Sequence, residues 1–138
     1  MTQPVGKKTV FFEIEIDVLG TSGDGIGRRA DGTTIIAPLT IPGDRIAVRA
    51  TKRKDRVLIA QKFDLIRLAP DRQTPPCPLF GSCGGCALQN LTPDAYTQWM
   101  RATVTERLKR RNIPVPTIRD PEPAKPGTRR RNSPAAAC

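Results

Sequence analysis

The sequence predicts a mainly β protein: a small five-stranded OB-like barrel, a cysteine-rich loop, one amphipathic helix and an irregular tail. Three patterns support this prediction. Apolar and polar residues alternate near the N-terminus, tight turns separate short apolar runs up to residue 66, and a helical repeat begins only after residue 91. We therefore expect the barrel over residues 9–68, the loop over 69–91, the helix over 92–112 and the proline-rich tail over 113–138.

The first predicted strand is TVFFEIEIDVL, residues 9–19. One face would carry Phe12, Ile14, Ile16 and Val18, and the other Glu13, Glu15 and Asp17. A period of two is typical of a strand with one buried face.

Further short strands follow within the predicted barrel. The run TTIIAPL lies between two glycine-containing turns, and Ile46, Val48, Val57 and Ile59 indicate strands around the sequence KRKD. A small all-β unit usually closes on itself, because closure removes the unpaired sheet edges that invite aggregation. This is the reason for predicting a barrel.

The helix has a clear start in the sequence. Thr92 suits the N-cap, Pro93 the first helical position and Asp94 the first turn. A stripe with a spacing of three and four then contains Tyr96, Trp99, Met100, Thr103, Val104, Arg107 and Leu108. The basic residues at the end of the helix have two equally good explanations: they complement the helix dipole, or they contact RNA.

The formal charge of +10 is spread over the whole chain. Such an excess favours a polyanionic partner, because Lys and Arg that neutralise phosphates release counterions, although a basic soluble surface is the alternative. The candidates for phosphate contacts are Arg28 and Arg29, after the glycine-rich turn GTSGDGIG, and Lys52, Arg53, Lys54 and Arg56. The glycine-rich turn itself leads into a strand, whereas a nucleotide-binding glycine loop leads into a helix.

Three of the four cysteines lie in CPLFGSCGGC, with the spacing C-x5-C-x2-C, and the chain has no histidine. Ligation by thiolates alone suits an iron–sulfur cluster or zinc. Zinc sites usually pair their cysteines more regularly, so the chemistry favours iron–sulfur over zinc, and unliganded buried thiols are the third possibility. Cys77, Cys83 and Cys86 are the candidate ligands, with Cys138 as the remaining thiol.

The N-terminus lacks the continuous apolar run of a signal peptide, and no stretch reaches the roughly 20 apolar residues of a transmembrane helix. We expect a cytoplasmic monomer without membrane association. In that compartment, clustered cysteines indicate a metal or redox role before disulfides.

The order of these features resembles the N-terminal part of the bacterial 23S rRNA (uracil-5-)-methyltransferases. The resemblance covers about residues 9–112 and is carried by GDGIGRRADG, PGDRIAVRATKRKD and, most specifically, CGGCALQ. It implies a TRAM-like RNA-binding barrel and a 4Fe-4S cluster with Cys77, Cys83 and Cys86 as three of its four ligands. It also implies 23S rRNA as the partner, and S-adenosylmethionine as the cofactor of a full-length relative.

The sequence departs from this family after GTRRR, where it continues as NSPAAAC. It shows no cofactor-binding glycine loop and no catalytic cysteine motif, so we expect a chain truncated before the methyltransferase domain and inactive alone. No catalytic or cofactor-binding residue is assigned. The fourth cluster ligand of the family comes later, inside a central domain, and Cys138 would have to fold back to replace it. The alternatives are a stand-alone RNA-binding adaptor with structural zinc, or a nonfunctional remnant.

Overall fold

The computed structural model describes residues 10–50 and 53–122. The chain divides into two compact units, Met1–Pro70 and Asp71–Cys138. Within the described residues the first unit is built from strands and the second carries a helix, which confirms the predicted mainly β fold. No helix in the described ranges is long and apolar enough to cross a membrane.

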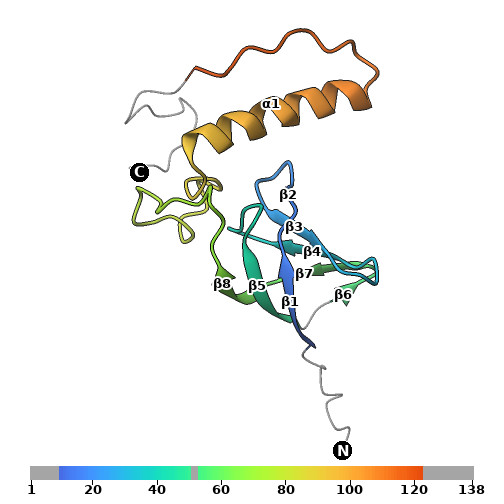
Figure 1. Cartoon of the computed structure of the whole chain (residues 1–138), viewed down its shortest axis with the longest axis vertical. Helices are drawn as coiled ribbons and strands as arrows, with labels where there is room; N and C mark the ends of the chain where they lie inside the picture. Colours follow the sequence, from blue (N-terminus) through green and yellow to red (C-terminus); the bar gives the residue numbers. More distant parts are fainter. Residues whose placement is uncertain (1–9, 51–52, 123–138) are drawn as a thin grey trace, which may run out of the picture. The chain divides into compact units, whose positions relative to one another are not determined.

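The strands of the first unit form two sheets in the part of the chain that is described (Figure 1). A three-stranded antiparallel sheet has the order β1 (Val10–Glu15), β5 (Arg45–Ala50), β8 (Lys62–Arg67). A five-stranded sheet has the order β2 (Val18–Leu19), β3 (Gly25–Arg28), β4 (Thr34–Ala37), β7 (Val57–Ile59), β6 (Arg53–Lys54). In the five-stranded sheet β4 and β7 are parallel, whereas the other neighbours are antiparallel.

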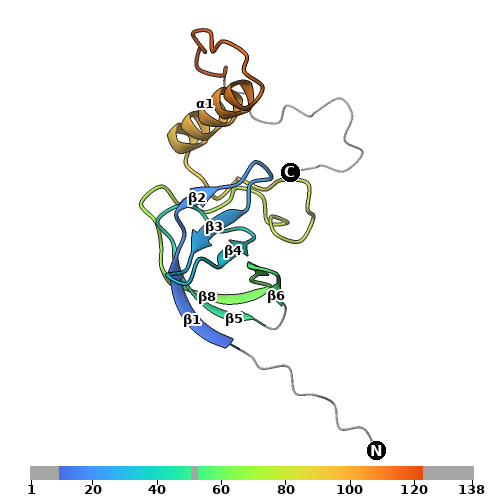
Figure 2. The ribbon, with the colours of Figure 1, turned by 90° about the vertical axis from the view of Figure 1, so that its right-hand side faces the viewer.

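The two sheets wrap around one apolar core (Figure 2). Alternate residues of the strands point inward, as the period-two pattern predicts. The buried cluster is Ile14, Ile35, Ala37, Ile46, Val48, Leu58 and Ala60, with Ile16 also in it and Phe12 and Phe63 packed against it. Burial of these branched side chains is the main favourable term that holds the unit together.

Two details of the strands differ from the sequence pattern. Val18 is 53% exposed, because the chain leaves β1 after Glu15 and Val18 already belongs to β2 of the other sheet. In β7 the buried residue is Leu58, while Val57 and Ile59 are exposed. Because all three residues of β7 are apolar, the sequence does not show whether Leu58 or its two neighbours face the core. The pairing of β7 with β4 turns Leu58 inward.

Acidic and basic side chains form ion pairs on the outer face of the three-stranded sheet. Glu13 lies 3.0 Å from Arg45, Glu15 lies 2.9 Å from Arg67, and Asp64 lies 3.5 Å from Arg49. All these side chains are about half exposed or more, so each pair contributes less than about 1 kcal/mol. The pairs nevertheless leave little uncompensated positive charge on this face.

Asp44 organises the turn between the two sheets. Its side chain is fully buried and accepts hydrogen bonds from the backbone N–H groups of Ile41 and Ala69, each at 2.9 Å. The carboxylate thereby joins the segment before β5 to the segment after β8. The same turn is fixed by the buried Thr40 hydroxyl, which donates to the carbonyl oxygen of Ala37 at 2.7 Å.

Gly27 marks a close approach between β3 and β1. A Cβ atom at this position would lie 2.6 Å from the carbonyl oxygen of Glu15. We therefore expect Gly27→Ala to lower the free energy of unfolding by about 1–3 kcal/mol, because backbone cannot yield as a side chain can. Urea unfolding followed by circular dichroism measures this loss. Gly20→Ala is the control, since its Cβ would meet the mobile end of Ile26 at 3.1 Å; equal losses for the two variants would contradict the expectation.

The second unit contains helix α1 (Pro93–Arg110), as the sequence predicts. Thr92 is the N-cap residue and proline lies in the first turn, although the threonine side chain makes no capping hydrogen bond. No residue of α1 is buried, and the predicted stripe is only partly covered, with Trp99, Met100, Thr103 and Leu108 half-buried. The helix ends through hydrogen bonds from Arg111, Asn112 and Ile113 back to its last turn.

Candidate functional site

Arg28 and Lys54, one from each of the two basic groups predicted in the barrel, lie on one row across the five-stranded sheet. Arg28 of β3 pairs with Thr34 of β4, Thr34 pairs with Val57 of β7, and Val57 pairs with Lys54 of β6. Residues 28 and 54 are thus three strand spacings apart, or about 14 Å between backbones at about 4.8 Å a step. We call Arg28, Lys54 and the adjacent Arg56 the basic row.

Arg56 reaches the row through the contact between two turns. Its carbonyl oxygen accepts a hydrogen bond from the backbone N–H of Thr34 at 2.8 Å. Its Nη1 atom lies 4.0 Å from the place where a Cβ of Gly32 would be. The turn before β7 therefore lies beside the turn between β3 and β4, which carries Arg29.

Arg28 and Arg56 present their charge to solvent. Both side chains are exposed, and no carboxylate among the described residues pairs with either guanidinium group. The position of Arg28 is fixed through its backbone N–H, which donates to the Asp17 carboxylate at 3.2 Å. These two arginines are therefore available for an anionic partner.

Arg29 is engaged within the domain instead. Its guanidinium carbon lies 4.4 Å from the centre of the Phe12 ring, and its Nη1 atom lies 3.5 Å from the Asp31 carboxylate. A stacked, partly neutralised guanidinium is a weaker candidate for a phosphate contact than Arg28. Of the other predicted residues, Lys52 lies outside the described ranges, and Arg53 and Lys54 are placed in β6 by their backbone alone.

The cysteine loop, residues 74–89, is closed at its base by hydrogen bonds within the second unit. The backbone N–H of Gln73 donates to the carbonyl oxygen of Asn90 at 2.8 Å, and the Gln73 amide donates to the carbonyl oxygen of Gln89 at 3.0 Å. The Gln89 side chain in turn accepts the backbone N–H of Cys77 at 3.2 Å. The first cysteine is thereby tied to the closure of the loop.

Inside the loop the cysteines occupy tight turns. The N–H of Phe80 donates to the carbonyl oxygen of Cys77 at 3.2 Å, and the N–H of Cys83 donates to that of Leu79 at 3.0 Å. Gly84 has a φ of 71°, a left-handed conformation that favours glycine. The glycines between the cysteines in the sequence therefore lie in tight turns of the structure.

The three cysteines differ in exposure: Cys77 is buried, Cys86 is half-buried and Cys83 is exposed. Their donor chemistry fits an iron–sulfur cluster or zinc. However, no group of three His, Cys, Asp or Glu side chains in residues 10–50 and 53–122 is arranged to hold a metal ion. The fourth candidate, Cys138, lies outside the described residues.

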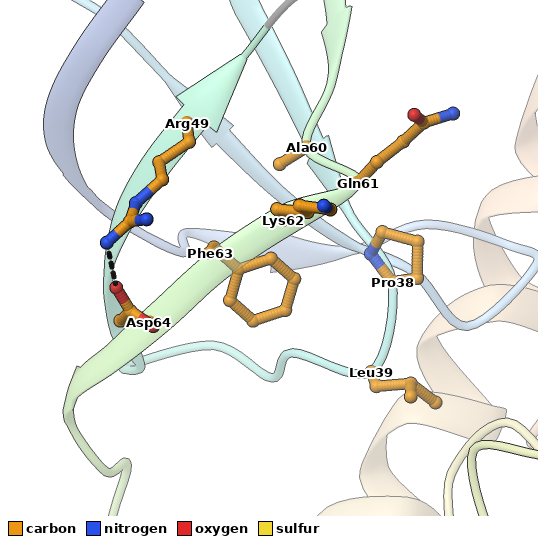
Figure 3. A pocket seen from close by; sticks show the side chains of 8 residues that line it. All are labelled: Pro38, Leu39, Arg49, Ala60, Gln61, Lys62, Phe63 and Asp64. Atoms are coloured by element: carbon orange, nitrogen blue, oxygen red, sulfur yellow. Dashed lines mark hydrogen bonds and ion pairs between the residues drawn. The ribbon is translucent and has the colours of Figure 1, made fainter.

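Sequence reasoning missed one site in the barrel, a cavity of about 500 Å³ beside β8. It is lined by residues from β5, β8, the corner after β4 and the corner before β8 (Figure 3). No local motif unites these residues. The only signal in the sequence was Phe63, one of the few aromatic residues of the barrel.

Comparisons with known proteins find relatives of this chain. The family described as tRNA (uracil(54)-C(5))-methyltransferase, TRAM domain, matches residues 13–70. The 23S rRNA (uracil(1939)-C(5))-methyltransferase RlmD of Chromohalobacter salexigens is 32% identical over 105 residues, which is 76% of this chain and 22% of that protein. An uncharacterized RNA methyltransferase of Brucella suis is 38% identical over 103 residues, covering 75% of this chain and 23% of the relative.

A solved structure is also similar. The crystal structure of Pyrococcus abyssi tRNA (uracil-54, C5)-methyltransferase in complex with S-adenosyl-L-homocysteine matches with a TM-score of 0.52 and 29% identity. The match covers 70% of this chain and 21% of that one, so the chain spans little more than a fifth of the proteins it matches. Residues 13–70 are therefore a TRAM domain of the tRNA and rRNA uracil-C5 methyltransferase family.

Proposed function

We propose that this chain is the RNA-binding and cluster-carrying region of an S-adenosylmethionine-dependent uracil-C5 methyltransferase acting on 23S rRNA. The proposed RNA binding rests on the basic row: Arg28 lies at the end of β3 and Arg56 in the turn before β7, and neither has a carboxylate partner in the described part of the chain. The curated relatives named as rRNA and RNA methyltransferases supply the class of nucleic acid.

The physical basis is neutralisation of backbone phosphates. Exposed guanidinium groups bind phosphate oxygens and release the counterions condensed on the RNA. For about four phosphate contacts, we expect the affinity for a labelled 23S rRNA fragment to fall roughly 50- to 150-fold between about 50 and 200 mM salt. Fluorescence anisotropy at several salt concentrations measures this slope. An affinity that does not change with salt would contradict the proposal.

For the cysteine loop we propose a 4Fe-4S cluster with Cys77, Cys83 and Cys86 as ligands. The support is the set of three cysteines in one loop whose base is held by hydrogen bonds. A bound cluster would link three points of the loop through the metal. The residues of the chain contribute thiolates, and glycine turns that let backbone amides approach sulfur.

Reconstitution with iron and sulfide under anaerobic conditions tests the cluster. We expect a brown protein with about four iron atoms per chain, and loss of the colour and the iron when Cys77, Cys83 and Cys86 are all replaced by serine. Cys138→Ser is the matched variant: retention of iron would show that this residue is not the fourth ligand. A colourless protein with one bound zinc would instead favour the adaptor with structural zinc.

For the 138-residue chain alone we propose RNA binding without methyl transfer, because it spans only 21–23% of the three methyltransferases compared above. Incubation with radiolabelled S-adenosylmethionine and a uridine-containing rRNA fragment tests this. Transfer of label to the RNA would contradict it.

A further inference from the structure

The TRAM domain carries a second candidate RNA contact that the basic row does not include. The cavity of about 500 Å³ is lined by Pro38, Leu39, Arg49, Ala60, Gln61, Lys62, Phe63 and Asp64 (Figure 3). We call it the Phe63 pocket. Its volume falls within the range of about 300–1,000 Å³ that is typical of small-ligand sites.

The pocket lies along the free edge of the three-stranded sheet. β8 pairs with β5 on one side only within the described residues, and the chain reaches β8 from β7 through Ala60 and Gln61. The residues that follow β4, Pro38 and Leu39, form the opposite wall (Figure 3). The pocket is therefore built from β5, β8 and two corners of one domain.

Phe63 gives the pocket an anchored aromatic surface. The residue pairs with Val48, whose side chain is fully buried, and the half-buried ring packs against the core. In Figure 3 the ring lies in the middle of the pocket, between Leu39 and Pro38 on one side and Arg49 and Asp64 on the other. A ring fixed in this way can stack on a nucleobase with little loss of side-chain entropy.

Leu39 supports a binding role through its backbone. It has a φ of 62°, in the left-handed region, and its side chain is 36% exposed. This conformation is unfavourable for a bulky residue, and glycine would adopt it freely. A strained leucine held at the mouth of a cavity points to a functional use of that side chain.

The charges at the rim suit a phosphate. Arg49 and Lys62 are cross-strand partners whose side chains leave the sheet on its outer face, opposite to Phe63, and both border the pocket at the edge strand β8. Asp64 compensates only one of these two cations, at 3.5 Å, and both members of that ion pair are more than half exposed. Arg49 also lies over the Phe11 ring, 5.1 Å from its centre, so Lys62 is the more available cation for a phosphate.

We propose that the Phe63 pocket binds one unpaired base of single-stranded RNA, with Phe63 as the stacking surface and Lys62 beside its phosphate. Leu39 and Pro38 cover the other side of the base, and the Gln61 amide lies at the rim where it can reach a base edge. This inference rests on the proposed RNA binding. It adds a contact that depends on the base, whereas the basic row reads phosphates alone.

Two labelled RNA strands of about twelve residues test the pocket: oligouridine and a strand of equal length made of abasic ribose phosphates. We expect the wild-type chain to bind oligouridine about tenfold more tightly, and Phe63→Leu to remove this preference. Phe63→Tyr should keep it. Phe12→Leu is the matched control, because this ring packs on the same core under Arg29 outside the pocket; it should change the affinity for both strands equally.

Leu39→Gly provides an independent variant, since glycine suits the backbone at this position and the fold should be retained. We expect it to reduce the preference for oligouridine at least threefold without lowering the midpoint of urea unfolding. Folded Phe63→Leu and Leu39→Gly proteins that retain the full preference would overturn the inference. Equal, salt-dependent binding of both strands by the wild-type chain would overturn the pocket and leave the proposed function standing, whereas binding of neither strand would overturn both.

Discussion

Replacing Asp44 with alanine is expected to lower the free energy of unfolding by about 3–4 kcal/mol. The fully buried carboxylate accepts the backbone N–H groups of Ile41 and Ala69 at 2.9 Å each. Alanine leaves both donors buried without this acceptor, and each such donor costs about 1–3 kcal/mol.

Urea unfolding monitored by circular dichroism measures the loss, and hydrogen exchange locates it. The amide protons of Ile41 and Ala69 should exchange much faster in the variant even under native conditions. Asp64→Ala is the matched control, because Asp64 is an exposed carboxylate whose ion pair with Arg49 is worth less than about 1 kcal/mol. If the two alanine variants unfold at the same urea concentration, the buried hydrogen bonds do not have the role assigned to them.

Local patterns predicted the elements of this fold better than their assembly. The alternation in β1 and the start of α1 at Thr92 and Pro93 depend on neighbouring residues, and the structure confirms both. Asp44 shows what local sequence patterns do not predict. In the sequence it reads as a surface turn residue after Pro42 and Gly43, and only the return of the chain at Ala69 makes it a buried acceptor.

The same holds for the candidate sites: the sequence predicted their residues, and only the fold shows which of them lie together. The residues of the basic row were predicted as two separate charged turns, and the pairing of β3, β4, β7 and β6 is what brings them to one side of the sheet. That pairing includes the parallel strands β4 and β7, a long-range feature without a local signal. Arg29 could not be distinguished from Arg28 until the Phe12 ring was found beneath it.

The largest effect on RNA binding is expected from reversing both free arginines of the basic row. In the double variant Arg28→Glu and Arg56→Glu, two phosphate contacts are lost and two carboxylates face the RNA backbone. We expect the affinity for a 23S rRNA fragment to fall roughly 100-fold at about 50 mM salt, and the slope of log K against log salt to decrease by about 1 for each contact. Anisotropy titrations measure both quantities.

The decisive comparison is with Arg45→Glu and Arg67→Glu, which change the net charge by the same amount on the three-stranded sheet. Those arginines already pair with Glu13 and Glu15 at 3.0 Å and 2.9 Å, so they hold little charge free for phosphate. A loss common to both double variants reflects the overall charge of the domain. Only the additional loss in the Arg28 and Arg56 variant measures the basic row, and if the two variants weaken binding equally, RNA is attracted by net charge and the row has no special part in it.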